Sequence, residues 1–248
     1  MPEQVAPPGP APTRRHGGPL LELGLVAAGL VAYLAVRWAT AGRTDEAVAN
    51  ARDVLALEQA LHLDLEHGIQ AATLTAPWLT EVATLFYVWG YFPAVIAVTL
   101  WLYVRDRDAY RTLRTALLVS GSLGLLVYAT FPCAPPWLTD PAYTDTVADA
   151  SLTGLARPGA ITNELGALPS FHCGWLVVAA AVLFVATRSR LVRVVCVAWP
   201  ALMAYAVVAT GNHWVLDVPA GLAIAGVGVL VAMHASAARP PETPRMPG

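Results

Sequence analysis

The sequence predicts an all-helical integral membrane protein, built as a bundle of six transmembrane helices with an amphipathic helix on its outer surface. Hydrophobic residues make up 56% of the chain and charged residues only 13%, and the mean hydropathy is +0.55. This composition is too apolar for an ordinary soluble domain. Six apolar stretches approach the roughly 20 residues that a helix needs to cross the hydrocarbon core of a bilayer. They are residues 20–38, 79–104, 113–131, 171–187, 191–210 and 214–235.

The second apolar stretch is long and contains Gly90 and Pro93. Proline removes a backbone hydrogen-bond donor, and neighbouring helices must then support the interrupted backbone. We therefore expect this span to be kinked.

Between the first two stretches, residues 45–67 predict an amphipathic helix at the membrane surface, because apolar residues recur at three-and-four spacing. Thr44 is placed to cap its start and Gly68 to end it. We expect this helix to cover the end of the bundle, and the alternative is a direct role in admitting substrate. Its opposite face carries Arg52, Asp53, Glu58 and Asp64.

All fifteen basic residues are arginines, and their distribution predicts the orientation in the membrane. Short cytoplasmic loops carry the excess of positive charge in membrane proteins. Eleven arginines fall on the side of the two chain ends, which predicts a multi-pass cell-membrane protein with both termini cytoplasmic. Arginines at membrane boundaries give no support to nucleic-acid binding. The four on the outer side are Arg37, Arg43, Arg52 and Arg157.

Two proline-rich segments flank the membrane domain. Residues 1–18 and 238–248 predict disordered cytoplasmic tails, and residues 19–237 a single membrane domain. The first tail lacks the apolar core and small-residue cleavage site of a signal peptide.

The outer loop before the fourth stretch begins with a run of prolines, which fixes the backbone without a helix. We expect Pro135, Pro136 and Trp137 to shape the mouth of a pocket, although Trp137 suits an interfacial anchor equally well. Cys133 and Cys173 lie near the same surface. They are interpreted as small buried side chains, with a disulfide as the alternative.

Two short motifs open long apolar segments on the outer side: Pro-Ser-Phe-His at residues 169–172 and His-Trp-Val-Leu-Asp at residues 213–217. A helix N-terminus presents unpaired N–H groups and a partial positive charge. A site built from two such ends suits an anionic phosphate group. The motifs therefore favour phosphoryl-transfer chemistry at the outer face.

The residues within these motifs allow a nucleophile with its supporting groups. Asp217 follows His213 by four positions, so on a helix the carboxylate can accept a hydrogen bond from one imidazole nitrogen. The other nitrogen is then free to attack phosphorus and form a phosphohistidine. His172 can act as general acid and base. Ser170 can offer its hydroxyl to a phosphate oxygen or serve only as an N-cap.

In these motifs the chain resembles the type-2 phosphatidic acid phosphatase superfamily, whose members are six-helix membrane enzymes, and in particular its inositolphosphotransferase branch. Supporting segments are residues 87–90, 50–70 and 132–136. The resemblance implies a metal-independent enzyme without cofactors that acts on a lipid phosphate, with His213 as nucleophile, Asp217 as its orienting partner and His172 as acid and base. Ser170 would help to bind phosphate.

The basic residues of this family are missing from the chain. There is no lysine, Ala206 and Val207 stand where the family has Ser-Arg, and Trp137 stands where the branch has arginine. Arg157 is the only arginine in the loop that leads into the first motif. We expect it to bind the phosphate, against the alternative of an ordinary surface arginine.

Several functions remain open from the sequence. Water or a polyol can accept the phosphoryl or head group, and the leading expectation is hydrolysis. The chain could also be an inactive transporter or scaffold, as the missing basic residues suggest, or a serine hydrolase that uses Ser170. A metal bound by His172, His213 and Asp217 is a minor alternative.

Overall fold

The computed structural model describes residues 18–148 and 163–238. The regular elements in these two ranges are α-helices, as the sequence predicts. In chain order they are α1 (Pro19–Thr40), α2 (Thr44–Leu61), α3 (Glu66–Leu74), α4 (Pro77–Trp89), α5 (Phe92–Arg105), α6 (Arg107–Thr130), α7 (Pro136–Thr139), α8 (Phe171–Ala186), α9 (Arg190–Ala209) and α10 (Asp217–Ala237).

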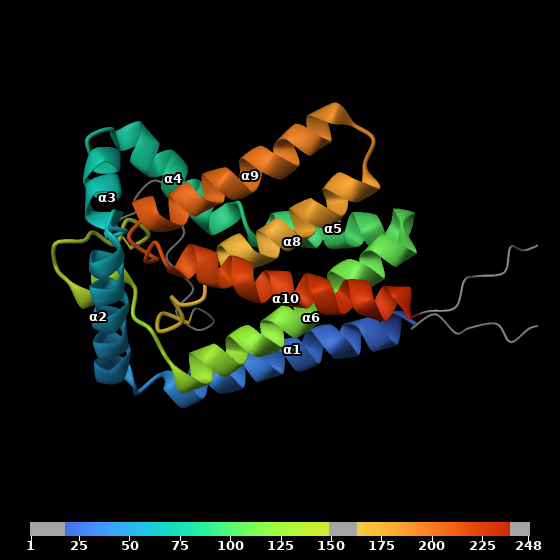
Figure 1. Cartoon of the computed structure of the whole chain (residues 1–248), viewed down its shortest axis with the longest axis horizontal. Helices are drawn as coiled ribbons and strands as arrows, with labels where there is room; N and C mark the ends of the chain where they lie inside the picture. The colour runs from blue at the N-terminus through green and yellow to red at the C-terminus, as the bar shows by residue number, and fades with distance from the viewer. Residues whose placement is uncertain (1–17, 149–162, 239–248) are drawn as a thin grey trace, which may run out of the picture.

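The long helices lie lengthwise in one bundle, and α2 and α3 lie across one end of it (Figure 1). The start of α1 and the end of α10 lie together at the opposite end. Helix α10 packs against α6 and α8, α8 also packs against α9, and α1 packs against α6. The two ends of the bundle therefore differ, because α2 and α3 cover only one of them. The motif residues that precede α10 lie at this covered end.

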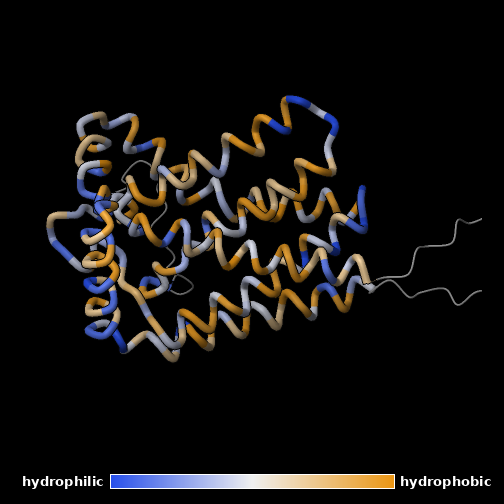
Figure 2. Tube along the Cα trace, viewed as in Figure 1, coloured by the Kyte–Doolittle hydropathy of each residue, from blue (hydrophilic) through white to orange (hydrophobic). Residues whose placement is uncertain are grey.

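The chain is a multi-pass membrane protein. Among the described residues, four helices are long and apolar enough to cross a bilayer, namely α1, α6, α9 and α10. The bent pair of α4 and α5 counts as a fifth span if the two helices form one crossing. Hydrophobic segments run along the bundle, with hydrophilic segments gathered near its ends (Figure 2). Large apolar side chains on the outer faces are more than half exposed, as at Leu23, Val26, Val194 and Leu230. Exposed apolar faces of this kind are suited to contact with the lipid bilayer.

The kink predicted in the second span is confirmed. Helices α4 and α5 meet at an angle of 44°, with Gly90 at the end of α4 and Pro93 in the first turn of α5. The indole N–H of Trp199 on α9 donates to the Gly90 carbonyl oxygen at 2.7 Å. A neighbouring helix thus supplies a hydrogen bond at the break, as a kinked membrane helix requires.

The single surface helix predicted over residues 45–67 is wrong in two respects. It is divided into α2 and α3, because His62 adopts a left-handed conformation with φ of 56°, and Gly68 lies inside α3. Glu58 was assigned to the solvent-facing side, yet it is 0% exposed. The spacing of apolar residues reports one buried face but does not reveal a partner that a distant loop brings to the other face.

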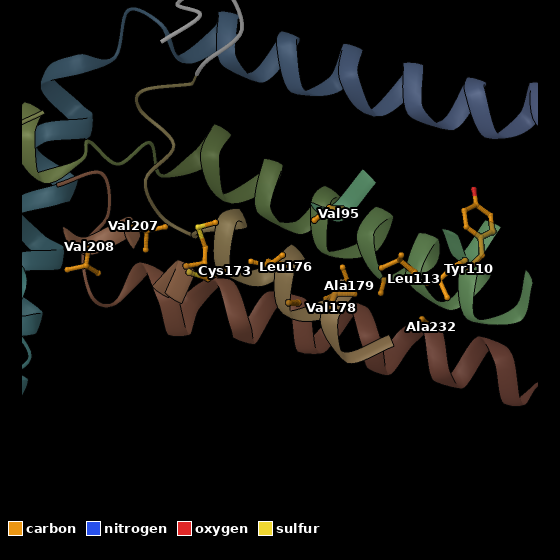
Figure 3. Packing of buried hydrophobic residues seen from close by; sticks show 14 residues of the cluster. Val95, Tyr110, Leu113, Cys173, Leu176, Val178, Ala179, Val207, Val208 and Ala232 are labelled. Atoms are coloured by element: carbon orange, nitrogen blue, oxygen red, sulfur yellow. The ribbon is translucent and has the colours of Figure 1, made fainter. Parts of the chain in front are cut away.

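Small side chains let the helices of the bundle approach closely. The buried core extends along the bundle through Val95 of α5, Leu113 of α6, Leu176 of α8 and Ala232 of α10 (Figure 3). A Cβ on Gly228 of α10 would lie 2.5 Å from the Ala116 carbonyl oxygen of α6, which is too close for any side chain. Glycine at helix crossings of this kind allows backbones to touch in membrane proteins.

Candidate active site

The first turns of α8 and α10 meet in direct backbone contact. The N–H of Ser170 donates to the Asp217 carbonyl oxygen at 3.0 Å. A Cβ on Gly221 would lie 2.2 Å from the Ser170 carbonyl oxygen, and one on Gly174 would lie 2.6 Å from the Gly221 carbonyl oxygen. These two glycines permit the contact, which places the Pro-Ser-Phe-His and His-Trp-Val-Leu-Asp motifs side by side.

His213 and Asp217 form a buried pair. The imidazole Nδ1 lies 3.1 Å from Asp217 Oδ2, and the side chains are 4% and 0% exposed. An ionised carboxylate only accepts hydrogen bonds, so Nδ1 carries the hydrogen and Nε2 keeps a lone pair. The expected pairing is present, but His213 lies in the turn before α10 and Asp217 opens the helix. Asp217 Oδ2 also accepts the Trp214 N–H at 2.8 Å, which fixes the turn.

Ser170 lies beside the nitrogen that Asp217 leaves free. Its Oγ is 3.4 Å from His213 Nε2, and it makes no capping hydrogen bond although it occupies the N-cap position of α8. Tyr128 on α6 donates its hydroxyl to the Pro169 carbonyl oxygen at 2.8 Å, which anchors this segment. The serine hydroxyl thus lies beside the candidate nucleophile and does not cap the backbone of its own helix.

His172 faces His213 across the same space, with ring centroids 5.6 Å apart and planes at 69°. Tyr87 stacks on the His172 ring at 4.5 Å, and Tyr91 lies against it at 4.7 Å. The tyrosines come from the end of α4 and the start of α5, so the kink in this span brings both to one imidazole. Tyr91 was not singled out from the sequence, and its position directly after Gly90 is the signal that points to it.

The turn that leads into α10 does not offer free N–H groups to phosphate, contrary to the expectation for both helix ends. Glu66 Oε1 accepts the N–H of Val215, and Glu58 Oε1 accepts the N–H of Leu216, each at 2.7 Å. Together with the bond to Trp214, three successive N–H groups are bound by the protein's own carboxylates. In the described part of the chain, the first three N–H groups of α8 have no such partner. Among the described residues, α8 is therefore the helix of the two whose start keeps N–H groups available to an anion.

Comparison with known families identifies the chain. A family model described as the PAP2 superfamily matches residues 52–231, which span both motifs and most of α2. The chain belongs to the PAP2 superfamily. The crystal structure of Aquifex aeolicus LpxE is similar in fold, with a TM-score of 0.52 and 19% sequence identity over 69% of this chain and 94% of that chain. A comparison with curated proteins finds no match.

The proline-rich loop of this PAP2 protein packs against the turn that carries His213. Pro135 and Pro136 are buried, and Trp137 donates its indole N–H to Asn212 Oδ1 and its backbone N–H to the Gly211 carbonyl oxygen, both at 3.3 Å. Trp137 thus packs against the turn that carries His213, which a role as membrane anchor alone does not require. That these residues form the mouth of a pocket stays a prediction.

Arg157 lies outside the described residues. Cys133 and Cys173 are buried and free, so they form no disulfide with each other. Within residues 18–148 and 163–238, no group of three or more His, Cys, Asp or Glu side chains is arranged to hold a metal ion.

Proposed function

We propose that this PAP2 protein is a membrane lipid phosphatase that cleaves a lipid-linked phosphoester through a phosphohistidine on His213. The observation that carries the proposal is the arrangement around one imidazole: Nδ1 binds the buried Asp217 carboxylate while Nε2 faces the Ser170 hydroxyl. This arrangement fixes the tautomer and leaves a nucleophilic lone pair beside a second histidine.

The reaction proceeds in two displacements. Nε2 of His213 attacks phosphorus, and Asp217 stabilises the positive charge that develops on the imidazole, as the carboxylate does in a catalytic triad. His172 donates a proton to the departing lipid alkoxide and then takes a proton from the incoming water. Attack by that water on the phosphohistidine releases phosphate and restores His213.

Phosphate binding is assigned to the start of α8. Its free N–H groups and the partial positive charge of the helix end attract the phosphate oxygens. Ser170 offers a hydroxyl at the same place, and Arg157 supplies the positive charge that the absent lysine of the family would otherwise provide. The role of Arg157 is supported by its place in the loop before the first motif. The role of Ser170 is supported by the position of its hydroxyl beside His213.

We further propose six crossings, with both termini cytoplasmic and the site outside. Helix α8 has 16 residues and is about 24 Å long at 1.5 Å per residue, which suits a crossing that starts below the outer boundary. Cysteines placed at Asp53 and Asp108 in a background free of native cysteines test the orientation. We expect an impermeant thiol reagent to label the first in intact cells and the second only after permeabilisation.

Hydrolysis is tested with purified protein and a diacylglycerol or polyprenyl phosphate. We expect phosphate release without any alcohol, and none from His213→Ala. The alternative is an inositolphosphotransferase-like head-group transfer, which the motif resemblance favours. A transferase must keep water from the phosphohistidine until its acceptor binds, so product would form only when a polyol is added. No turnover of either kind would leave an inactive transporter or scaffold.

A further inference from the structure

Two glutamates lie buried next to the catalytic turn without touching the reacting space. Glu58 of α2 is 0% exposed and Glu66 of α3 is 1% exposed. Each carboxyl accepts one backbone N–H at 2.7 Å, Glu58 from Leu216 and Glu66 from Val215. These bonds join segments 158 and 149 residues apart in the sequence. A buried carboxyl is costly unless its oxygens have partners, so its placement here needs an explanation.

The remaining oxygens of the two carboxyls indicate how the pair is held. Oε2 of Glu58 and Oε2 of Glu66 are both buried and lack a donor. Two ionised carboxylates cannot satisfy each other, because neither carries a hydrogen, whereas one shared proton gives one of them a donor. Burial, and then the hydrogen-bonding Glu66 side chain, raise the pKa of Glu58 to about 9. At neutral pH Glu58 therefore keeps its proton, which it can share with the Glu66 carboxyl.

The N–H groups that the pair binds lie between the two members of the candidate catalytic pair. His213 precedes Trp214, Val215 and Leu216, and Asp217 follows them. The Nδ1 to Oδ2 contact depends on the path of the backbone through these three residues. A displacement at Val215 or Leu216 changes the position of both side chains.

We propose that Glu58 and Glu66, joined by one shared proton, are positioning residues that hold His213 and Asp217 in the geometry for attack on phosphorus. Neither glutamate contacts the substrate, and both act through the backbone of residues 214–216. The inference deepens the proposed function and rests on it for the reaction that the positioning serves. The structural claim, that the pair fixes this turn, can be measured without any substrate.

The protonation state of Glu58 also sets the pH range over which the pair holds the turn in place. The groups that face it are Glu66 from α3, Asp217 from α10, and Cys133 and Tyr143 from the segment between α6 and α8. Burial raises the pKa of the Cys133 thiol far above its usual range and the pKa of Tyr143 to about 12, so neither gains charge between pH 6 and 10 and Glu58 is the group that titrates. Loss of the shared proton puts two charged carboxylates together in a buried place and loosens the turn.

Three variants test the proposal. Glu58→Gln replaces the protonated carboxyl by an amide, which can accept from Leu216 and donate to Glu66 without titrating. Glu58→Ala removes both contacts. Asp53→Asn is the matched control, because Asp53 is an exposed carboxylate on the same helix. Steady-state kinetics from pH 6 to 10, thermal unfolding and backbone hydrogen exchange over residues 213–217 are measured for each.

We expect Glu58→Ala to lower kcat at least tenfold with KM nearly unchanged, since misplacing reacting groups by about 1 Å costs on the order of 100-fold in rate. Its amides at 213–217 should exchange faster, while those of α6 do not change. We expect the wild-type rate to fall near pH 9, and Glu58→Gln should recover most of kcat and lose this alkaline fall. Asp53→Asn should match the wild type.

The outcomes separate this inference from the proposed function. If the wild type turns over no lipid phosphate, the proposed function fails, and faster exchange in Glu58→Ala still supports fixation of the turn. Unchanged exchange in Glu58→Ala, or a wild-type kcat, overturns the positioning role. If Glu58→Ala does not fold, Glu58→Gln decides, and an alkaline fall in rate that is identical to the wild type contradicts the shared proton.

Discussion

Replacing Gly221 by alanine tests whether the contact between α8 and α10 sets the catalytic geometry. The new Cβ would lie 2.2 Å from the Ser170 carbonyl oxygen, where real Cβ atoms stay beyond 3.0 Å, so the two helix starts must separate by at least about 0.8 Å. Overpacking of this kind costs about 1–3 kcal/mol of stability. The same displacement moves Ser170 away from His213 and should lower kcat by about 100-fold.

The assays are phosphate release from a lipid phosphate and thermal unfolding in detergent. Gly226→Ala is the matched control, because it lies on the same helix and a Cβ there meets nothing within 4 Å. We expect this control to keep wild-type kinetics and to gain up to about 1 kcal/mol from the higher helix propensity of alanine. Wild-type kcat and unfolding temperature in Gly221→Ala would refute the reasoning.

Four further predictions follow from the site and its surroundings. His213→Ala should abolish turnover and the labelled phospho-enzyme, because no other described group lies ready to replace its nitrogen; residual labelling would contradict this. His172→Ala should reduce hydrolysis of alkyl phosphates far more than of aryl phosphates, which need less protonation of the leaving group, and equal losses would argue against its role as an acid. Arg157→Ala should weaken catalysis by about 1.5–3 kcal/mol in kcat/KM, with partial recovery in Arg157→Lys, whereas unchanged kinetics would make it a surface residue. The free energy of unfolding of the wild type should fall as the pH rises from about 5 to about 9. Over this range Glu58 keeps its proton in the folded protein, whereas the carboxyl of the unfolded chain, with a pKa of 4.5, has released it. The unfolding temperature of Glu58→Gln should lack this decrease with pH.

Local patterns in the sequence predict part of this structure well. The kink at Gly90 follows from the backbone chemistry of glycine and proline within one apolar stretch. The contact between His213 and Asp217 follows from their spacing, although a capping turn and not a helical face produces it. Both features depend on residues a few positions apart, which is the range over which backbone geometry alone sets distances.

Long-range partners are what the sequence does not reveal. The charge pattern of α2 assigns Glu58 to solvent, because nothing in its neighbourhood shows that the N–H of Leu216 will reach it. For the same reason the sequence predicts an anion site at the start of α10, whereas Glu58 and Glu66 bind the N–H groups of the turn that leads into it. The contact of the Tyr91 ring with His172 likewise depends on how two distant helices pack. These features arise from tertiary packing, which cannot be predicted from the spacing of apolar residues along the sequence.

The bonds from α2 and α3 to the turn before α10 also bear on the order in which the protein is made. Glu58 and Glu66 leave the ribosome well before Val215 and Leu216, so the segment that contains α2 and α3 must already lie on the same side of the membrane where the start of the last helix will lie. A chain released before α10, or one whose first hairpin is inserted with the wrong orientation, lacks a complete catalytic turn. If the proposed mechanism holds, phosphoester cleavage requires a fully synthesised and correctly inserted molecule.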